Sequence, residues 1–67
     1  MQIKVIFHIR EIREEQKISI RQLAEKSGVS KSHISDIENG RRIPTVYILC
    51  VLAVAMNVQP AELSINI

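Results

Sequence analysis

The sequence predicts an all-α domain of five short helices, and three observations support this fold class. Apolar residues recur at helical spacing from His8 onward. Serine and glycine residues stand where helices begin and end in the middle of the chain. The run from residue 46 to 56 carries no charge. A membrane span needs about 20 apolar residues, so this shorter run predicts a buried helix instead.

The first seventeen residues change from a period of two to a helical period. Over residues 1–7 the apolar side chains Ile3, Val5 and Phe7 lie on one side. This alternation predicts a short extended segment. From His8 to Lys17, Ile9 and Ile12 recur at helical spacing, which predicts the first helix.

Two capping signals define the second and third helices. Ser19 and Gln22 have the spacing of a capping box, in which each side chain binds the backbone N–H of the other residue. Gly28 then ends the helix in a left-handed conformation. Ser30 caps the next helix, and Gly40 closes it in the same way. The expected helices cover about residues 20–27 and 31–39.

A fourth helix and a short fifth one complete the prediction. Thr45 follows a proline and precedes the uncharged helix 46–56. Pro60 stands at the first turn of the fifth helix, 60–63, where its missing N–H does no harm. Residues 64–67 are again extended in character. The core-facing residues of the fourth helix are predicted to be Val46, Leu49, Leu52, Ala53 and Met56.

The outer face of the fourth helix is as apolar as its inner face. A helix that is apolar all round must be covered all round. Two covers are possible, a second copy of the chain or the chain's own ends, paired as short strands. We expect a homodimer interface centred on Tyr47, Val51 and Val54, with the chain ends alongside.

The segment from Ser19 to Gly40 has the form of a helix-turn-helix, with small Ala24 where the helices cross. A plain helical hairpin is the alternative. On the third helix, Ile34 and Ile37 define the buried side. The opposite side is polar, and it comprises Lys31, Ser32, Ser35, Asp36 and Asn39. Such side chains can bind base edges or phosphates, and their small size permits close approach of a duplex.

Composition and charge exclude other classes of function. The chain has 67 residues, a net charge of +2 and one cysteine, Cys50, so an internal disulfide is impossible. His8 and His33 have no catalytic or metal-ligating constellation around them. We therefore expect no enzyme activity, no cofactor and no metal. The absence of a visible targeting segment, together with the lone thiol, predicts a cytoplasmic protein.

Three sequence runs resemble the phage-repressor-like (Xre, Cro-type) family of helix-turn-helix regulators. They are Leu-Ala-Glu-Lys-Ser-Gly-Val-Ser (23–30), Ile-Glu-Asn-Gly (37–40) followed by Arg and Pro, and Asn-Val-Gln-Pro-Ala-Glu-Leu (57–63). The resemblance covers about residues 8–63. It implies a five-helix lambda-repressor-like domain, here a single domain over residues 1–67. It also implies that the third helix reads DNA, usually within a homodimer.

The same resemblance assigns residue roles. Lys31, Ser32 and Ser35 match base-reading positions, and Asn39 matches a phosphate contact. Arg41 and Arg42 lie in the loop that approaches the DNA backbone, and we add Arg21 as a basic residue of the second helix. Arg13 and Glu38 match an ion pair between the first and third helices. The chain departs from the family at Ile20, where glutamine is usual, and at Asp36, a carboxylate in a reading position.

The leading hypothesis is a homodimeric regulator that binds an inverted-repeat site on double-stranded DNA, with no membrane or small-molecule substrate as a partner. One alternative is an antitoxin of the same fold, which binds DNA and a toxin enzyme, because the apolar fourth helix suits such a partner equally well. A second alternative is a protein-interaction module that has lost DNA binding, which Ile20 and Asp36 favour.

Overall fold

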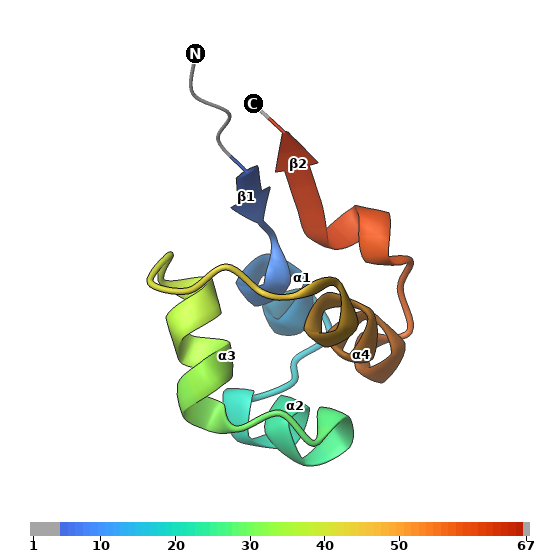
Figure 1. Ribbon diagram of the computed structural model, residues 1–67. Coiled ribbons are helices and arrows are strands. Elements are labelled where there is room, and N and C mark those ends of the chain that lie inside the picture. Colours follow the sequence, from blue (N-terminus) through green and yellow to red (C-terminus); the bar gives the residue numbers. More distant parts are fainter. Residues whose placement is uncertain (1–4, 67) are drawn as a thin grey trace.

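The computed structural model describes residues 5–66, which form four α-helices, one 3-10 turn and a pair of short strands (Figure 1). In chain order the elements are β1 (Val5–Phe7), α1 (Ile9–Glu15), α2 (Ile20–Ser27), α3 (Lys31–Glu38), α4 (Val46–Met56), the 3-10 turn η1 (Pro60–Leu63) and β2 (Ser64–Asn66). Among these elements, no helix combines the length and the apolar character needed to cross a membrane.

The capping residues predicted for the middle of the chain are confirmed. The Ser19 hydroxyl accepts a hydrogen bond from the Gln22 backbone N–H at 3.0 Å, and the Gln22 side chain accepts one from the Ser19 N–H at 2.8 Å. The Ser30 hydroxyl caps α3 by accepting from the His33 N–H at 3.2 Å. Gly28 ends α2 with a φ of 78°, in the left-handed region. These bonds satisfy backbone groups that a helix end leaves without partners.

Helix α3 ends in a Schellman motif. The Arg41 N–H donates to the Asp36 carbonyl at 2.8 Å, and the Gly40 N–H donates to the Ile37 carbonyl at 3.2 Å. Gly40 has a φ of 76°, which this motif requires at that position. The motif turns the chain sharply, so that the basic loop after Gly40 stays beside the last turn of α3.

Helix α1 is shorter than its sequence pattern predicts, because it ends at Glu15 rather than at Lys17. Lys17 adopts a φ of 57°, and the Ile18 N–H donates to the Arg13 carbonyl at 3.1 Å. This is again a left-handed helix end, but a lysine occupies the position where glycine is usual. Without a glycine there, the sequence carried no signal for the stop.

The core lies where α1, α2, α3 and α4 converge, and among the described residues those buried as a whole, backbone and side chain together, are all apolar. These residues are Ile9, Leu23, Val29, Ile34, Ile37, Leu52, Ala53, Met56 and Leu63. Helix α2 packs against both α3 and α4. Helix α3 stands at the edge of the bundle, so its outer face is open to solvent (Figure 1).

The prediction for α4 is correct in its second half and wrong at its start. Leu52, Ala53 and Met56 are buried as expected, but Val46 is 79% exposed. Val46 is the first residue of the helix, which meets the core only in later turns. Tyr47 and Val54 are also largely exposed, at 74% and 79%. The outer side of α4 therefore presents an apolar surface to solvent.

The two ends of the described chain meet in a small antiparallel sheet. Val5 pairs with Asn66, Ile6 with Ile65, and Phe7 with Ser64. Ile3 and Ile67, which the sequence also assigns to extended segments, lie outside the described residues.

The predicted fifth helix is a single 3-10 turn. Its hydrogen bond, from the Glu62 N–H to the Gln59 carbonyl at 2.9 Å, spans only three residues. Because β2 begins at Ser64, directly after this turn, there is no room for an α-helix.

The turn between α2 and α3 generates a stability prediction. Replacing Gly28 with alanine should lower the free energy of unfolding by about 1–2 kcal/mol, because a Cβ is strained in the left-handed region. No atom lies within 4 Å of the added Cβ, so a steric clash does not contribute. Gly28→Asn is the matched control, and it should lose less, because asparagine tolerates this conformation. Urea unfolding measures both, and equal losses would contradict the backbone explanation.

Candidate nucleic-acid interface

The outer face of α3 borders a hollow of about 330 Å³, which we call the α3 hollow. Its lining residues are Ile20, Lys31, Ser32, Ser35, Asp36 and Arg41. Lys31 and Ser32 are exposed in the first turn of the helix, and Ser35 is half-buried one turn later. The three residues predicted to read bases therefore lie together, in a depression open to solvent.

Asp36 and Arg41 form an ion pair at the rim of the α3 hollow. The Arg41 Nε lies 3.0 Å from the Asp36 Oδ1, with the two side chains 62% and 32% exposed. The Schellman motif at the end of α3 brings them together, because it folds Arg41 back over the last turn. This pairing was missed in the sequence, although the spacing of five residues across a helix end with glycine was a usable signal.

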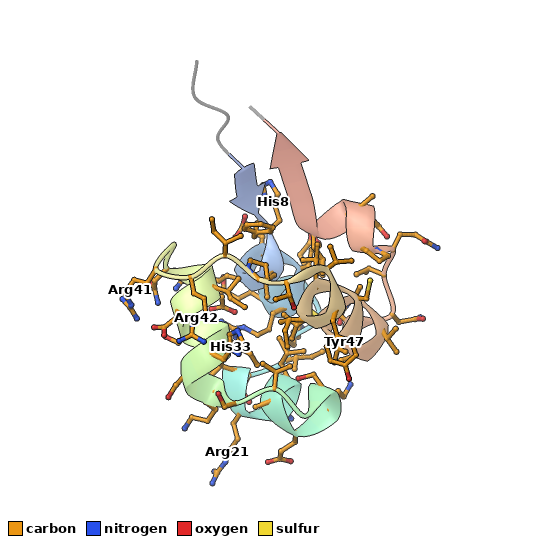
Figure 2. All side chains as sticks on the ribbon, viewed as in Figure 1. His8, Arg21, His33, Arg41, Arg42 and Tyr47 are labelled. Carbon is orange, nitrogen blue, oxygen red and sulfur yellow. The ribbon has the colours of Figure 1, made fainter. Side chains whose placement is uncertain are left out.

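The remaining predicted basic contacts lie beyond the ends of α3. Figure 2 shows Arg21 projecting from the start of α2, near the first turn of α3, and Arg41 projecting from the loop beyond the last turn. Arg42 is exposed in the same loop. Positive charge thus flanks the small polar residues of the helix at both ends. This distribution is suited to contact with the phosphates of a duplex whose groove holds α3.

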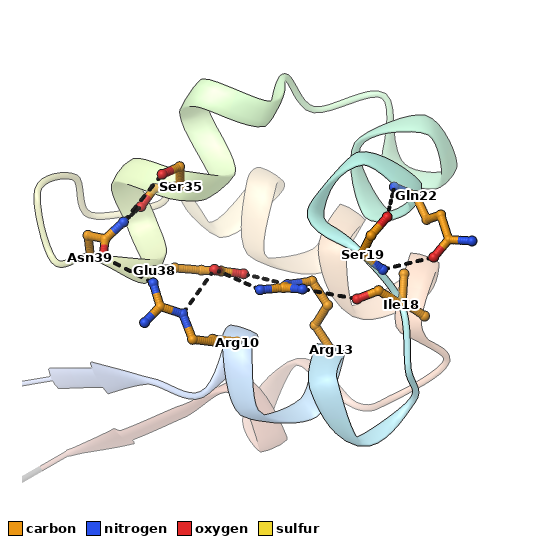
Figure 3. A network of polar contacts seen from close by, with 8 residues as sticks. All are labelled: Arg10, Arg13, Ile18, Ser19, Gln22, Ser35, Glu38 and Asn39. Atoms are coloured by element: carbon orange, nitrogen blue, oxygen red, sulfur yellow. Dashed lines mark hydrogen bonds and ion pairs between the residues drawn. The ribbon is translucent and has the colours of Figure 1, made fainter.

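Asn39 is exposed, but its side chain is bound to other protein groups and does not line the α3 hollow. Its side-chain Nδ2 donates to the Ser35 carbonyl at 2.8 Å and to the Ser35 hydroxyl at 3.3 Å. Its Oδ1 accepts from the Arg10 Nη2 at 3.0 Å (Figure 3). Contact between this amide and a phosphate would therefore require a change in one of these bonds. The assignment of Asn39 as a phosphate contact stays a prediction.

Below this surface, the Glu38 carboxylate is 2% exposed and is bound by two arginines of α1 (Figure 3). Arg13 donates from Nε to one carboxylate oxygen at 2.9 Å and from Nη2 to the other at 3.2 Å. Arg10 lies 3.3 Å from the same carboxylate. The hydrogen bond to Glu38 raises the pKa of the Arg13 guanidinium above its ordinary value, against the opposite effect of burial. The ion pair between Arg13 and Glu38 is confirmed.

The role of Arg10 was missed in the sequence. Arg10 and Arg13 are three residues apart on a helix, so they share a face, and this spacing was the available signal. Arg13 also donates from Nη1 to the Ile18 carbonyl at 3.0 Å. The two arginines thereby connect α1 to the last turn of α3 and to the turn that leads into α2. They hold the helix-turn-helix in place from the side of α1, and Arg10 also contacts the exposed Asn39.

The described residues offer little that suggests another kind of site. No group of three histidine, cysteine or acidic side chains in residues 5–66 is placed to hold a metal ion. His8, which directly precedes α1, binds Glu11 of that helix through its Nδ1 at 2.6 Å. A second hollow, of about 270 Å³, lies along the outer side of α4 and is lined by Lys26, Ser27, Tyr47, Cys50, Val51, Val54 and Ala55.

Known proteins share this arrangement. Residues 9–63 match the helix-turn-helix family. The HTH-type transcriptional repressor RghR of Bacillus subtilis is 45% identical over 51 residues, which are 75% of this chain and 38% of RghR. The restriction-modification controller protein C.AhdI of Aeromonas hydrophila superposes with a TM-score of 0.80 at 31% identity, over 82% of this chain and 83% of that protein.

A third comparison concerns a structure solved with DNA. The biofilm master regulator SinR, in its complex with DNA, superposes with a TM-score of 0.77 at 33% identity. The match covers 81% of this chain and 87% of that of SinR. This chain spans only about two fifths of the length of the curated relatives that it matches.

The Glu38 network predicts an asymmetric response to mutation. Arg13→Met should lower the free energy of unfolding by about 2–3 kcal/mol, because it removes the main partner of a buried carboxylate. This loss is smaller than the one expected if the carboxylate lost every partner, because Arg10 still binds it. The double variant Arg13→Met with Glu38→Leu should recover part of the loss, because no buried charge is left. Exposed Arg21→Met is the control for urea unfolding, and an Arg13→Met midpoint equal to that of the control would contradict the prediction.

Proposed function

This chain belongs to the phage-repressor-like helix-turn-helix family, and from that premise we propose that it regulates transcription by binding a specific site on double-stranded DNA. One observation carries the proposal, the α3 hollow. Its polar side chains are small or flexible, and they lie on the open face of the second helix of the motif. In this motif that face enters the major groove.

In this proposal the residues that contact DNA divide into two groups. Lys31, Ser32 and Ser35 contact base edges, where lysine can donate to guanine acceptors and serine can bind several bases. Phosphates on either side are contacted by the basic residues beyond the ends of α3 and by Asn39. The basic residues are Arg21, Arg41 and Arg42. Base contacts specify the sequence, whereas phosphate contacts fix the register of the protein on the duplex.

We further infer that the regulator acts as a homodimer. A single α3 reads only a few base pairs, and the exposed apolar side of α4 needs a cover. A two-fold dimer through Tyr47, Val51 and Val54 meets both requirements, and the hollow beside them has the apolar lining that such an interface uses. The two α3 helices would then lie about 34 Å apart, one turn of DNA, and the operator would be an inverted repeat.

The DNA contacts are tested on a duplex selected from random sequence. Lys31→Ala should weaken binding by about 1–3 kcal/mol if the lysine contacts a base. Arg42→Ala should instead lower affinity evenly across sequences and reduce the slope of log K against log salt by about 1. Fluorescence anisotropy over a salt series measures both effects.

The control for these variants removes the same charge elsewhere. Lys17→Asn serves because Lys17 is exposed, lies outside the α3 hollow and has a left-handed backbone that asparagine tolerates. It should leave binding close to wild type. Undiminished specific binding by the triple variant Lys31→Ala, Ser32→Ala and Ser35→Ala would refute the assignment of α3.

The dimer is tested by placing a charge on the outer side of α4. Val54 is 79% exposed, so Val54→Glu should leave the protomer folded. If the side chain lies in the interface, the variant should sediment as a monomer and bind the operator more weakly, because taking a carboxylate out of water into a mostly apolar interface costs free energy. Gln59→Glu adds the same charge at an exposed position after α4 and should change neither property.

Two results would count against this interface. One is a wild-type monomer at tens of micromolar. The other is a Val54→Glu variant with wild-type mass and operator affinity. Co-purification of a different chain that Val54→Glu abolishes would favour an antitoxin-like role for the same surface.

A further inference from the structure

We propose that Ile20 is a specificity-determining residue that contacts the 5-methyl group of a pyrimidine in the major groove. The inference rests on the proposed DNA-binding function and goes beyond it, because it assigns a chemical preference to one position of the operator. It starts from an apolar side chain among the polar groups of the α3 hollow.

Ile20 is the first residue of α2 and is half-buried. One part of its side chain packs against the core, and another part lines the α3 hollow. The other five lining residues are all polar or charged, namely Lys31, Ser32, Ser35, Asp36 and Arg41. The core contact fixes the position of the side chain, so the apolar group is presented at a defined place beside the residues proposed to read bases.

The chemistry of the α3 hollow disfavours a phosphate beside Ile20. An isoleucine side chain has no donor for a phosphate oxygen. Asp36 lies on the same hollow, and the hydrogen bond from Arg41 at 3.0 Å fixes one oxygen of its carboxylate there. A phosphate in this place would meet the cations Lys31 and Arg41 but also a carboxylate of like charge, and it would gain no hydrogen bond from Ile20. A base edge is the better occupant, because it offers an apolar group to Ile20 as well as hydrogen-bonding groups to the polar side chains.

Among the groups that base pairs present in the major groove, the apolar one is the methyl at C5 of thymine. Methylation of cytosine places the same group at the same position. Contact with Ile20 removes this methyl from water. The transfer of one methyl-sized group corresponds to about a fourfold change in Kd. Thymine and 5-methylcytosine share this chemistry, and they differ in the polar group at C4.

The experiment changes single methyl groups in the DNA. In the duplex selected from random sequence, each thymine of a half-site is replaced in turn by deoxyuridine, which removes the methyl and keeps the base pair. Each cytosine is replaced in turn by 5-methylcytosine. The quantity measured is the ratio of Kd values for the two forms of the same duplex. Any loss of overall affinity or stability in a protein variant cancels in this ratio.

We expect one position per half-site at which removing the methyl weakens wild-type binding about three- to tenfold. In Ile20→Ala the ratio at that position should fall to about one, and in Ile20→Val, the more conservative variant, it should be intermediate. A thymine at this position would identify thymine as the natural source of the methyl. Gain of affinity only with 5-methylcytosine would identify the methylated base.

The inference is overturned if no position depends on the methyl, or if the dependent position keeps its ratio in Ile20→Ala. In either case tight, sequence-selective binding of the duplex would leave the proposed function intact. Failure to select any duplex from random sequence, by contrast, would overturn the proposed function and this inference together.

Discussion

The buried carboxylate of Glu38 is the constraint on which the arrangement of the helices depends. A charge with 2% exposure must be paired, and both of its arginine partners come from α1. Arg13 also binds the backbone at Ile18, so a single cluster fixes α1 against the end of α3 and the start of α2. In a chain of 67 residues the apolar core is small. A charged cluster supplies directional contacts that the apolar side chains lack.

The cluster also organises the surface above it. Arg10 binds Glu38 and Asn39 together, and Asn39 in turn binds Ser35. Arg41, in the loop that follows α3, is held by Asp36 of the last turn. The last turn of α3 and the loop after it are therefore ordered by hydrogen bonds within the protein. Lys31 and Ser32, in the first turn, are exposed, which leaves them free to adjust in the proposed contact with a base edge.

The sequence predicted the features that depend on neighbouring residues. Ser19 and Gly28 mark helix ends through bonds to residues a few positions away, and such bonds leave a clear pattern. Arg13 and Glu38 were paired only through family resemblance, since 25 residues separate them. Lys17 has a left-handed backbone conformation, but lysine is not a residue type that indicates a helix end. The exposure of Val46 depends on which turns of α4 contact the core. Helical periodicity shows which face of a helix is apolar, but not which of its turns are covered.

The pairing of β1 with β2 bears on the order in which the protein folds. It joins residue 5 to residue 66, whereas the helices that pack together, α2 with α3 and α2 with α4, are closer to each other in the chain. Contacts between distant residues close a long loop, and the entropy of closure must be overcome before they contribute. The helices can therefore assemble first, with the sheet added to a formed bundle. A two-stranded sheet is marginally stable alone, so we expect its amides to exchange with solvent through local opening, well before the core of the bundle unfolds.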